Sequence, residues 1–340
     1  MSLRNILRRI RIWALSGGAA LLTALALHGS SASAEEVSLA LNYTLGAGHG
    51  GLVAAEQLGY FKDAGLTVTV VPWSSQTRSE TLVAAGRTNF AFVASCDDAL
   101  VNFAADRPVK AVAALVQHDP AEIGVRSDSP ITRPRQLDGK TYGGFGSTKE
   151  PLLLESLLQS DGGKGDIKVV TLGAAAYEAV YGGQVDAALF WDYSDAIQAE
   201  IVGRSMRYFR FHDYGLPDQY GDQIMANSDY LKNHEGVAKR FLAALVKGYR
   251  YELAHPKEVA DMLAKAGSNA DLAFTVRSIE AFDKTLAAAD GSIGSMDIEV
   301  WKTRGDYWIK RGFLVDEAGE KVTKSINYAN FITNAYLPAK

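Results

Sequence analysis

The sequence predicts an α/β protein with two lobes of the same plan, and the first observation behind this is an internal repeat. The stretches TLVAAGRTNFAFVAS (residues 81–95) and YEAVYGGQVDAALFW (177–191) match when aligned. Each has an apolar helical end, a glycine, an Asn or Asp three residues later, and an apolar run. The two glycines, Gly86 and Gly183, lie 97 residues apart. A glycine followed by a short apolar run is typical of a helix that stops and leads into a buried strand.

The second observation is the order of the segments around the repeat. Each half reads strand, glycine-rich loop, helix, strand, helix, strand. The strands VSLALNY and LTVTVV open the first half, and GKTYGGF and DIKVVTL stand in the same places in the second. Strands that alternate with helices predict a mainly parallel sheet covered by helices on both faces. The chain is also longer than one typical core, which favours two lobes.

The third observation is that the pattern becomes mostly helical after Tyr220. VAKRFLAALVKGYRYEL has apolar positions at helical spacing, and the segments that follow continue this theme. We expect these helices to brace the first lobe. The predicted division is a leader (1–34), lobe 1 (35–125), lobe 2 (126–217) and a return to lobe 1 (218–340).

The first 34 residues resemble a secretory signal peptide. A basic start with four arginines precedes the apolar stretch WALSGGAALLTALAL, and small residues suit cleavage after Ala34. A membrane anchor is the alternative, but the apolar run is short for a span and contains glycines and a serine. Because no cysteine follows the cleavage position, we expect a free periplasmic protein and not a lipid-anchored one.

Charge and cysteine content exclude several classes of function. Without the leader, the 35 basic residues fall by four and the 39 acidic residues stay, which gives a net charge of −8. That balance argues against a nucleic-acid surface and against a basic membrane-binding face. The single cysteine, Cys96, cannot form an intramolecular disulfide. We expect a monomer that is not embedded in the membrane and is stabilised by burial.

Candidate site residues follow from the strand ends, because ligands of open parallel sheets sit beyond the carboxyl ends of the strands. These ends offer aromatic rings, carboxylates and backbone N–H groups, which suit a small, flat, polar ligand. The predicted ligand-binding residues are Tyr43, His49, Cys96, Asp97, Phe145, Gly146, Ser147, Trp191, Asp192 and Tyr193.

Competing interpretations of these residues are weaker. GGFGSTKE lacks the ending of a nucleotide P-loop and the glycine spacing of a dinucleotide site. Ser147 and Glu150 have the spacing of a capping box, so the loop also predicts a helix start whose N–H groups can hold an acceptor. Asp97 is equally suited to capping a helix. The histidines lack metal-site spacing, and no nucleophile is tied to a base, so we expect no metal, no cofactor and no catalysis.

Several stretches resemble periplasmic solute-binding proteins of ABC importers. They are LNYTLGAGHGGLVAAEQLGYFKDAGLTV, VQHDPAEIGV, GKTYGGFGSTKEP and VAKRFLAALVKGYRYELAHPKEVADML. The resemblance covers nearly the whole chain after the leader, and it points to the ThiY-like branch of the sulfonate/nitrate/taurine-type family. The Gln117-His118 pair belongs to these motifs, so His118 joins the predicted ligand-binding residues.

The resemblance implies a two-lobed (type II) periplasmic binding fold that closes on its ligand and delivers it to an ABC permease with its ATPase. It also implies a thiamine pyrimidine precursor as ligand. Tyr43, Trp191 and either Phe145 or Tyr193 would stack on the ring. Asp192 or Asp97 would accept hydrogen bonds from an amine and a ring nitrogen, and loop N–H groups near Gly146 and Ser147 would hold an acceptor.

Two alternatives remain open at this point. The same fold could bind riboflavin or an alkylsulfonate such as a taurine-like solute, although a sulfonate site should favour hydroxyls and N–H groups over aromatic rings. The chain could also be an enzyme of pyrimidine metabolism. The related enzymes use a cysteine-rich iron motif, which a chain with one cysteine cannot supply.

Overall fold

The computed structural model describes residues 34–74, 76–147, 149–268 and 270–339. The expected signal peptide lies outside the described residues, apart from Ala34. The first strand, β1 (Glu35–Ala40), begins directly after that residue.

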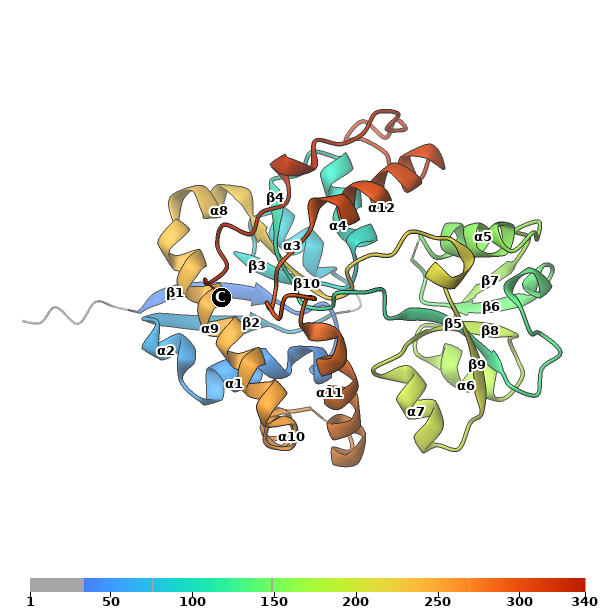
Figure 1. Ribbon diagram of the computed structural model, residues 1–340, viewed down its shortest axis with the longest axis horizontal. Coiled ribbons are helices and arrows are strands. Elements are labelled where there is room, and N and C mark those ends of the chain that lie inside the picture. Colours follow the sequence, from blue (N-terminus) through green and yellow to red (C-terminus); the bar gives the residue numbers. More distant parts are fainter. Residues whose placement is uncertain (1–33, 75, 148, 269, 340) are drawn as a thin grey trace, which may run out of the picture. The chain divides into compact units, whose positions relative to one another are not determined.

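Lobe 1 contains a five-stranded sheet in the order β2-β1-β3-β10-β4 (Figure 1). Strand β1 runs parallel to β2 and β3, whereas β10 is antiparallel to both β3 and β4. The remaining strands are β2 (Leu66–Val71), β3 (Phe90–Val93), β4 (Val109–Ala114) and β10 (Gln223–Asn227).

Lobe 2 repeats this plan with a sheet in the order β7-β6-β8-β5-β9 (Figure 1). Strand β6 is parallel to β7 and β8, and β5 is antiparallel to β8 and β9. The strands are β5 (Ala121–Arg126), β6 (Thr141–Gly144), β7 (Lys168–Thr171), β8 (Ala187–Trp191) and β9 (Met206–Arg210).

The repeat seen in the sequence has a structural basis at matching positions. Gly86 and Gly183 both adopt positive φ, 64° and 71°, which glycine tolerates best. Three residues later, Asn89 Oδ1 accepts the backbone N–H of Ser38 at 2.8 Å. In lobe 2 the equivalent Asp186 Oδ2 accepts the N–H of Thr141 at 2.9 Å. In each lobe, therefore, the side chain at this equivalent position joins the start of the third strand to the first strand by a hydrogen bond.

The sheets are mainly parallel, as expected, and one further feature of the fold differs from the sequence expectation. Four strands of each sheet run in the same direction, and the strand that follows a crossing between lobes, β5 or β10, runs antiparallel to its neighbours. The expected boundary after residue 125 would also cut β5, which lies wholly in the sheet of lobe 2. Local apolar patterns cannot reveal a strand's direction or its partner sheet, and both depend on where the chain crosses.

Helices cover both faces of each sheet. In lobe 1, α1, α9 and α11 pack over one core, and α4 and α12 pack over the other, so the carboxy-terminal helices brace this lobe as expected. In lobe 2, α5 covers one face and α6 and α7 the other (Figure 1). The helices are α1 (Gly50–Gln57), α2 (Tyr60–Asp63), α3 (Ser79–Ala84), α4 (Cys96–Ala104), α5 (Glu150–Ser160), α6 (Ala175–Tyr181), α7 (Asp195–Ile201), α8 (Ser228–Asn233), α9 (Glu235–Ala254), α10 (Pro256–Lys265), α11 (Leu272–Leu286) and α12 (Ile298–Lys310).

Four short 3-10 helices complete the fold: η1 (Ala47–His49), η2 (Pro134–Leu137), η3 (His212–Tyr214) and η4 (Tyr328–Asn330). Within the residues that the structure describes, no helix has both the length and the apolar character required to cross a bilayer.

Candidate ligand-binding crevice

The loops that follow β1, β3, β6 and β8 supply the predicted site residues, as the strand-end rule expects. Contacts between the lobes bring these loops together. Lys149, next to the first residue of α5 in lobe 2, places its Nζ 2.6 Å from Asp98 Oδ2 in lobe 1. Tyr193, after β8, donates its hydroxyl to Asp222 Oδ2 at 2.7 Å. These contacts join the two lobes beside the loops that carry the predicted site residues.

A buried polar network forms the lobe 1 side of the crevice. Asn42 Nδ2 donates to Asp222 Oδ1 at 2.6 Å, and Asn42 Oδ1 lies 3.1 Å from His49 Nε2. Burial raises the pKa of Asp222 to about 6, although the hydrogen bonds from Tyr193 and Asn42 act to lower it. Burial lowers the pKa of His49 to about 4, so its imidazole is neutral at pH 7. His49 and Tyr193 thus hold this network, and His49 also packs edge-on against Phe92.

The network predicts an acid sensitivity of folding that depends on His49. Its pKa in the folded protein is below the ordinary value of 6.5, so the stability it contributes is present above pH 6.5 and is lost as pH falls towards 4. The loss should approach about 3 kcal/mol. We expect His49→Gln to be less sensitive to pH over this range than wild type in urea unfolding, and the same change at exposed His212 to leave the pH profile unaltered. Equal slopes for wild type and His49→Gln would contradict this account.

Aromatic rings lie near the strand ends of both lobes. Tyr43, which is 48% exposed, lies with its ring centroid 5.2 Å from that of Trp73 in lobe 1. In lobe 2, Phe145 lies 5.7 Å from Tyr177. Trp191 is half-buried and packs against both main cores. These rings offer flat apolar surfaces on two sides of the crevice.

The carboxylate beside these rings is Asp195, which the sequence interpretation did not single out. Its Oδ2 accepts the N–H of Trp191 at 3.0 Å, and its carboxylate is hydrogen-bonded to the Tyr177 hydroxyl. Burial raises its pKa to about 6. Burial and, to a lesser extent, the charge of Asp195 raise the pKa of Tyr43. Asp192 instead lines a separate pocket between α7 and α11, and burial raises the pKa of its carboxyl group. Asp195 is thus the acid placed among the rings.

Two predicted residues after β3 lie in the core, which corrects the expectation for them. Asp97 is fully buried and bound by Arg304 Nε at 2.8 Å, Arg304 Nη2 at 2.6 Å and Trp308 Nε1 at 2.6 Å. Cys96 is also fully buried. The first turn of α4 therefore directs these two side chains inward, away from any ligand. Asp98 is the acid of this turn that meets lobe 2.

A charged cluster surrounds Asp98 at the contact between the lobes. Besides Lys149, it binds Arg78 Nη2 at 2.8 Å and the Ser95 hydroxyl at 2.6 Å. Burial favours a higher pKa for Asp98, but Lys149 and Arg78 hold it below its usual value. The cluster is thus an ion pair that joins the lobes.

The glycine loop before α5 differs from its expected role. Glu150 Oε2 accepts the backbone N–H of Phe145 at 2.9 Å, and the N–H of Ser147 also donates to this carboxylate. Those N–H groups therefore already have an acceptor within the chain. Only half of the expected capping box is present: Glu150 accepts the N–H of Ser147, but α5 begins at Glu150 and the Ser147 hydroxyl accepts the N–H of Lys149 instead. Gly146 adopts φ of +85°, which explains the glycine.

His118 lies at the crossings between the lobes. It is exposed, and its Nδ1 is 2.6 Å from Asp218 Oδ2. The same carboxylate accepts the N–H of Asp119 at 2.9 Å, so the two crossing segments are bound side by side. His118 thus holds a hinge segment. In the described part of the chain, no group of three or more His, Cys, Asp or Glu side chains could hold a metal ion.

Three residues near these rings and contacts were not among the predicted site residues, for different reasons. Tyr177 lies in the internal repeat, at the start of its helix, and its position there could have identified it. Trp73 follows the second strand, an end that the strand-end rule covers. Lys149 carried no signal, because its role depends on the opposite lobe.

Comparisons with known proteins agree with this architecture. The family model described as NMT1/THI5 like matches residues 47–259. The formylaminopyrimidine-binding protein of Halalkalibacterium halodurans is 22% identical over 300 residues, which cover 85% of this chain and 91% of the relative.

Two solved structures share the fold. The periplasmic aliphatic sulphonate binding protein SsuA of Escherichia coli has a TM-score of 0.65 at 18% identity, covering 88% of this chain and 92% of its own. The alkanesulfonate-binding protein SsuA of Xanthomonas axonopodis pv. citri, bound to MOPS, has a TM-score of 0.66 at 17% identity, covering 89% and 99%.

The two-lobed fold is that of periplasmic solute-binding proteins. The chain belongs to the NMT1/THI5-like family.

Proposed function

We propose that the protein captures a thiamine pyrimidine precursor and delivers it to an ABC permease with its ATPase. One observation supports the choice of ligand. The carboxylate of Asp195, whose pKa is raised to about 6, lies among aromatic side chains of both lobes. An aminopyrimidine offers a flat ring for these aromatic faces and N–H donors for the carboxylate. The name of the Halalkalibacterium relative supports the same ligand class.

Within this proposal, the ligand ring is faced from lobe 1 by Tyr43 and Trp73. It is faced from lobe 2 by Trp191 at the end of β8 and by Phe145 and Tyr177. Stacking and a few desolvated hydrogen bonds are sufficient for micromolar or tighter affinity, about −8 kcal/mol or better. Closure of the lobes would bury the ligand and form the surface that a permease recognises.

We also infer that the chain is exported to the periplasm, cleaved after Ala34, and active as a monomer. The basic and apolar character of the leader and the small residues before the cleavage position support export. The start of β1 directly after Ala34 is consistent with a fold that does not need the leader.

Calorimetric titration tests the ligand. The titrants are an aminomethylpyrimidine precursor, thiamine, riboflavin and an alkylsulfonate, added to protein that was unfolded and refolded to remove bound ligand. We expect tight binding of the pyrimidine and weakening by tenfold or more in Trp191→Ala, because a stacking ring is worth about 1–1.5 kcal/mol or more. Heat from riboflavin or a sulfonate, with none from the pyrimidine, would keep the importer class and reject this ligand.

The role of Asp195 has a separate signature in pH. Its pKa is about 6, and only the ionised carboxylate accepts from both ligand donors, so affinity should fall as pH drops below 6. We expect Asp195→Asn to bind about 10- to 100-fold more weakly at pH 7.5, equivalent to about 1.5–3 kcal/mol. The variant should also lose the pH dependence between 5 and 7. A variant that keeps the wild-type pH profile would remove Asp195 from the proposed site.

A further inference from the structure

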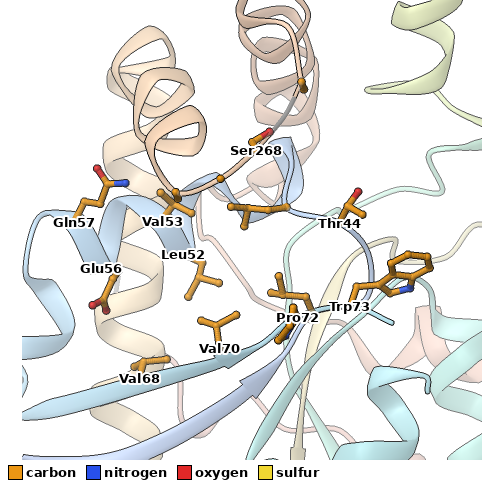
Figure 2. Close-up of a pocket in the computed structure, with 15 residues that line it drawn as sticks. Thr44, Leu52, Val53, Glu56, Gln57, Val68, Val70, Pro72, Trp73 and Ser268 are labelled. Carbon is orange, nitrogen blue, oxygen red and sulfur yellow. The ribbon is translucent and has the colours of Figure 1, made fainter. Parts of the chain in front are cut away.

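Lobe 1 has a second concave site beside the crevice. A pocket of about 640 Å³ lies between α1, the end of β2 and the loop after α10 (Figure 2). Its apolar wall is formed by Leu52, Val53, Val68, Val70, Pro72 and Trp73. This volume is in the range of sites that hold small organic molecules.

Two side chains of this wall are unusually exposed for apolar residues. Val70 and Trp73 are 39% and 37% exposed. Both belong to the outer edge of the sheet, because β2 is its edge strand and Trp73 follows β2. Clustered apolar side chains that remain exposed in a hollow indicate a binding surface.

One charged side chain lines the pocket among its described residues, and it is Glu56. It follows Leu52 and Val53 by four and three positions on α1, so the three side chains share a face of that helix. Glu56 is exposed and has no side-chain hydrogen bond or ion pair with any residue that the structure describes. Gln57, beside it, donates to the carbonyl of Met262 at 2.8 Å and so fixes α10 against α1.

We propose that this pocket is a second ligand site, which takes an amphipathic organic cation. The apolar body of the ligand lies against Val53, Val68 and Val70, and its ammonium group lies next to the Glu56 carboxylate. An unpaired carboxylate at the edge of an apolar hollow favours a cation over a neutral or anionic molecule of the same shape.

Trp73 connects this site to the crevice. Figure 2 shows it at the end of the pocket next to Thr44. Its ring centroid lies 5.2 Å from that of Tyr43, which faces the crevice. A ligand in the pocket therefore contacts the same tryptophan as a ligand in the crevice.

The test uses three probes with one body and different charge: 4-phenylbutylammonium, 4-phenylbutanol and 4-phenylbutyrate. Methyl NMR of the protein as it is purified from the producing cells maps their binding in the presence of saturating crevice ligand, or without it if none is known. We expect saturable shifts at Val53, Val68 and Val70, with the ammonium binding about two- to fivefold tighter than the alcohol, and the carboxylate weakest.

Matched variants separate the charge from the apolar wall. Glu56→Gln should remove the preference for the ammonium, and Glu317→Gln, a similar change in a distant turn, should keep it. Val70→Arg should abolish the shifts by filling the pocket. Val101→Arg on α4 is the control, since Val101 is 43% exposed and does not line the pocket.

Three results would overturn the proposal. The first is equal binding of the three probes, and the second is probe binding that Val70→Arg leaves unchanged. The third is a set of shifts at the same valines that appears on raising the protein concentration without a probe, because the pocket would then be covered by a second copy of the chain.

Discussion

Replacing Asp97 by alanine is expected to lower the free energy of unfolding by about 3–5 kcal/mol, because the change leaves the buried Arg304 guanidinium without its counter-charge. Trp308 Nε1 would lose its acceptor as well. The effect should extend to a crossing between the lobes, since Arg304 Nη1 also donates to the carbonyl of Pro217 at 2.6 Å. Urea unfolding, followed by tryptophan fluorescence, measures the loss.

A double replacement is the control for this first prediction. In Asp97→Leu/Arg304→Met both charges are removed together, and apolar side chains of similar volume fill the space. Buried pairs replaced in this way often keep or gain stability, so we expect the double variant to be clearly more stable than Asp97→Ala. If it is equally unstable, shape and not charge explains the loss.

Gly248→Leu is expected to lower the stability by about 3 kcal/mol or more, because α1 and α9 touch through their backbones at this point. A Cβ on Gly248 would lie 2.0 Å from the carbonyl oxygen of Gly51 and 2.9 Å from Cβ of Ala55. Neither atom belongs to a flexible side chain, so the helices must separate. The higher helix propensity of leucine, about 1 kcal/mol, offsets only part of this cost.

Gly236→Leu provides a matched control on the same helix. A Cβ at Gly236 meets only the Nη1 atom of Arg240 at 3.7 Å, so this variant should be as stable as wild type or slightly more stable. The measurement is thermal unfolding of both variants, in which the melting temperature of Gly248→Leu is compared with that of Gly236→Leu. Equal melting temperatures would mean that the contact between α1 and α9 can adjust without loss.

The repeat made the fold predictable, because the same local chemistry occurs twice. Asn89 and Asp186 bind the first strand of their lobes in equivalent ways, and the spacing between them was visible in the sequence. The mainly parallel character of the sheets was visible as well. The one antiparallel strand of each sheet was not, since β5 and β10 enter each sheet after the chain has crossed from the other lobe.

The strand ends predict which loops carry the candidate site, but the direction of each side chain could not be predicted. Asp97 and Asp98 are neighbours in one helical turn, and the rotation of α4 buries the first and exposes the second to Lys149. The N–H groups of the glycine loop were expected to be free for a ligand, but Glu150 of the same chain already binds them.

The position of β10 has a consequence for how the protein forms as it emerges from synthesis or export. All strands of lobe 2 lie in one continuous stretch, 121–210, so this lobe can assemble as soon as that stretch is present. The sheet of lobe 1 must wait for β10, which fills the space between β3 and β4 and arrives only after the whole of lobe 2. Until then the two strands would have unpaired edges, which are open to wrong pairing with other chains. The second lobe in the sequence is therefore the first that can be completed.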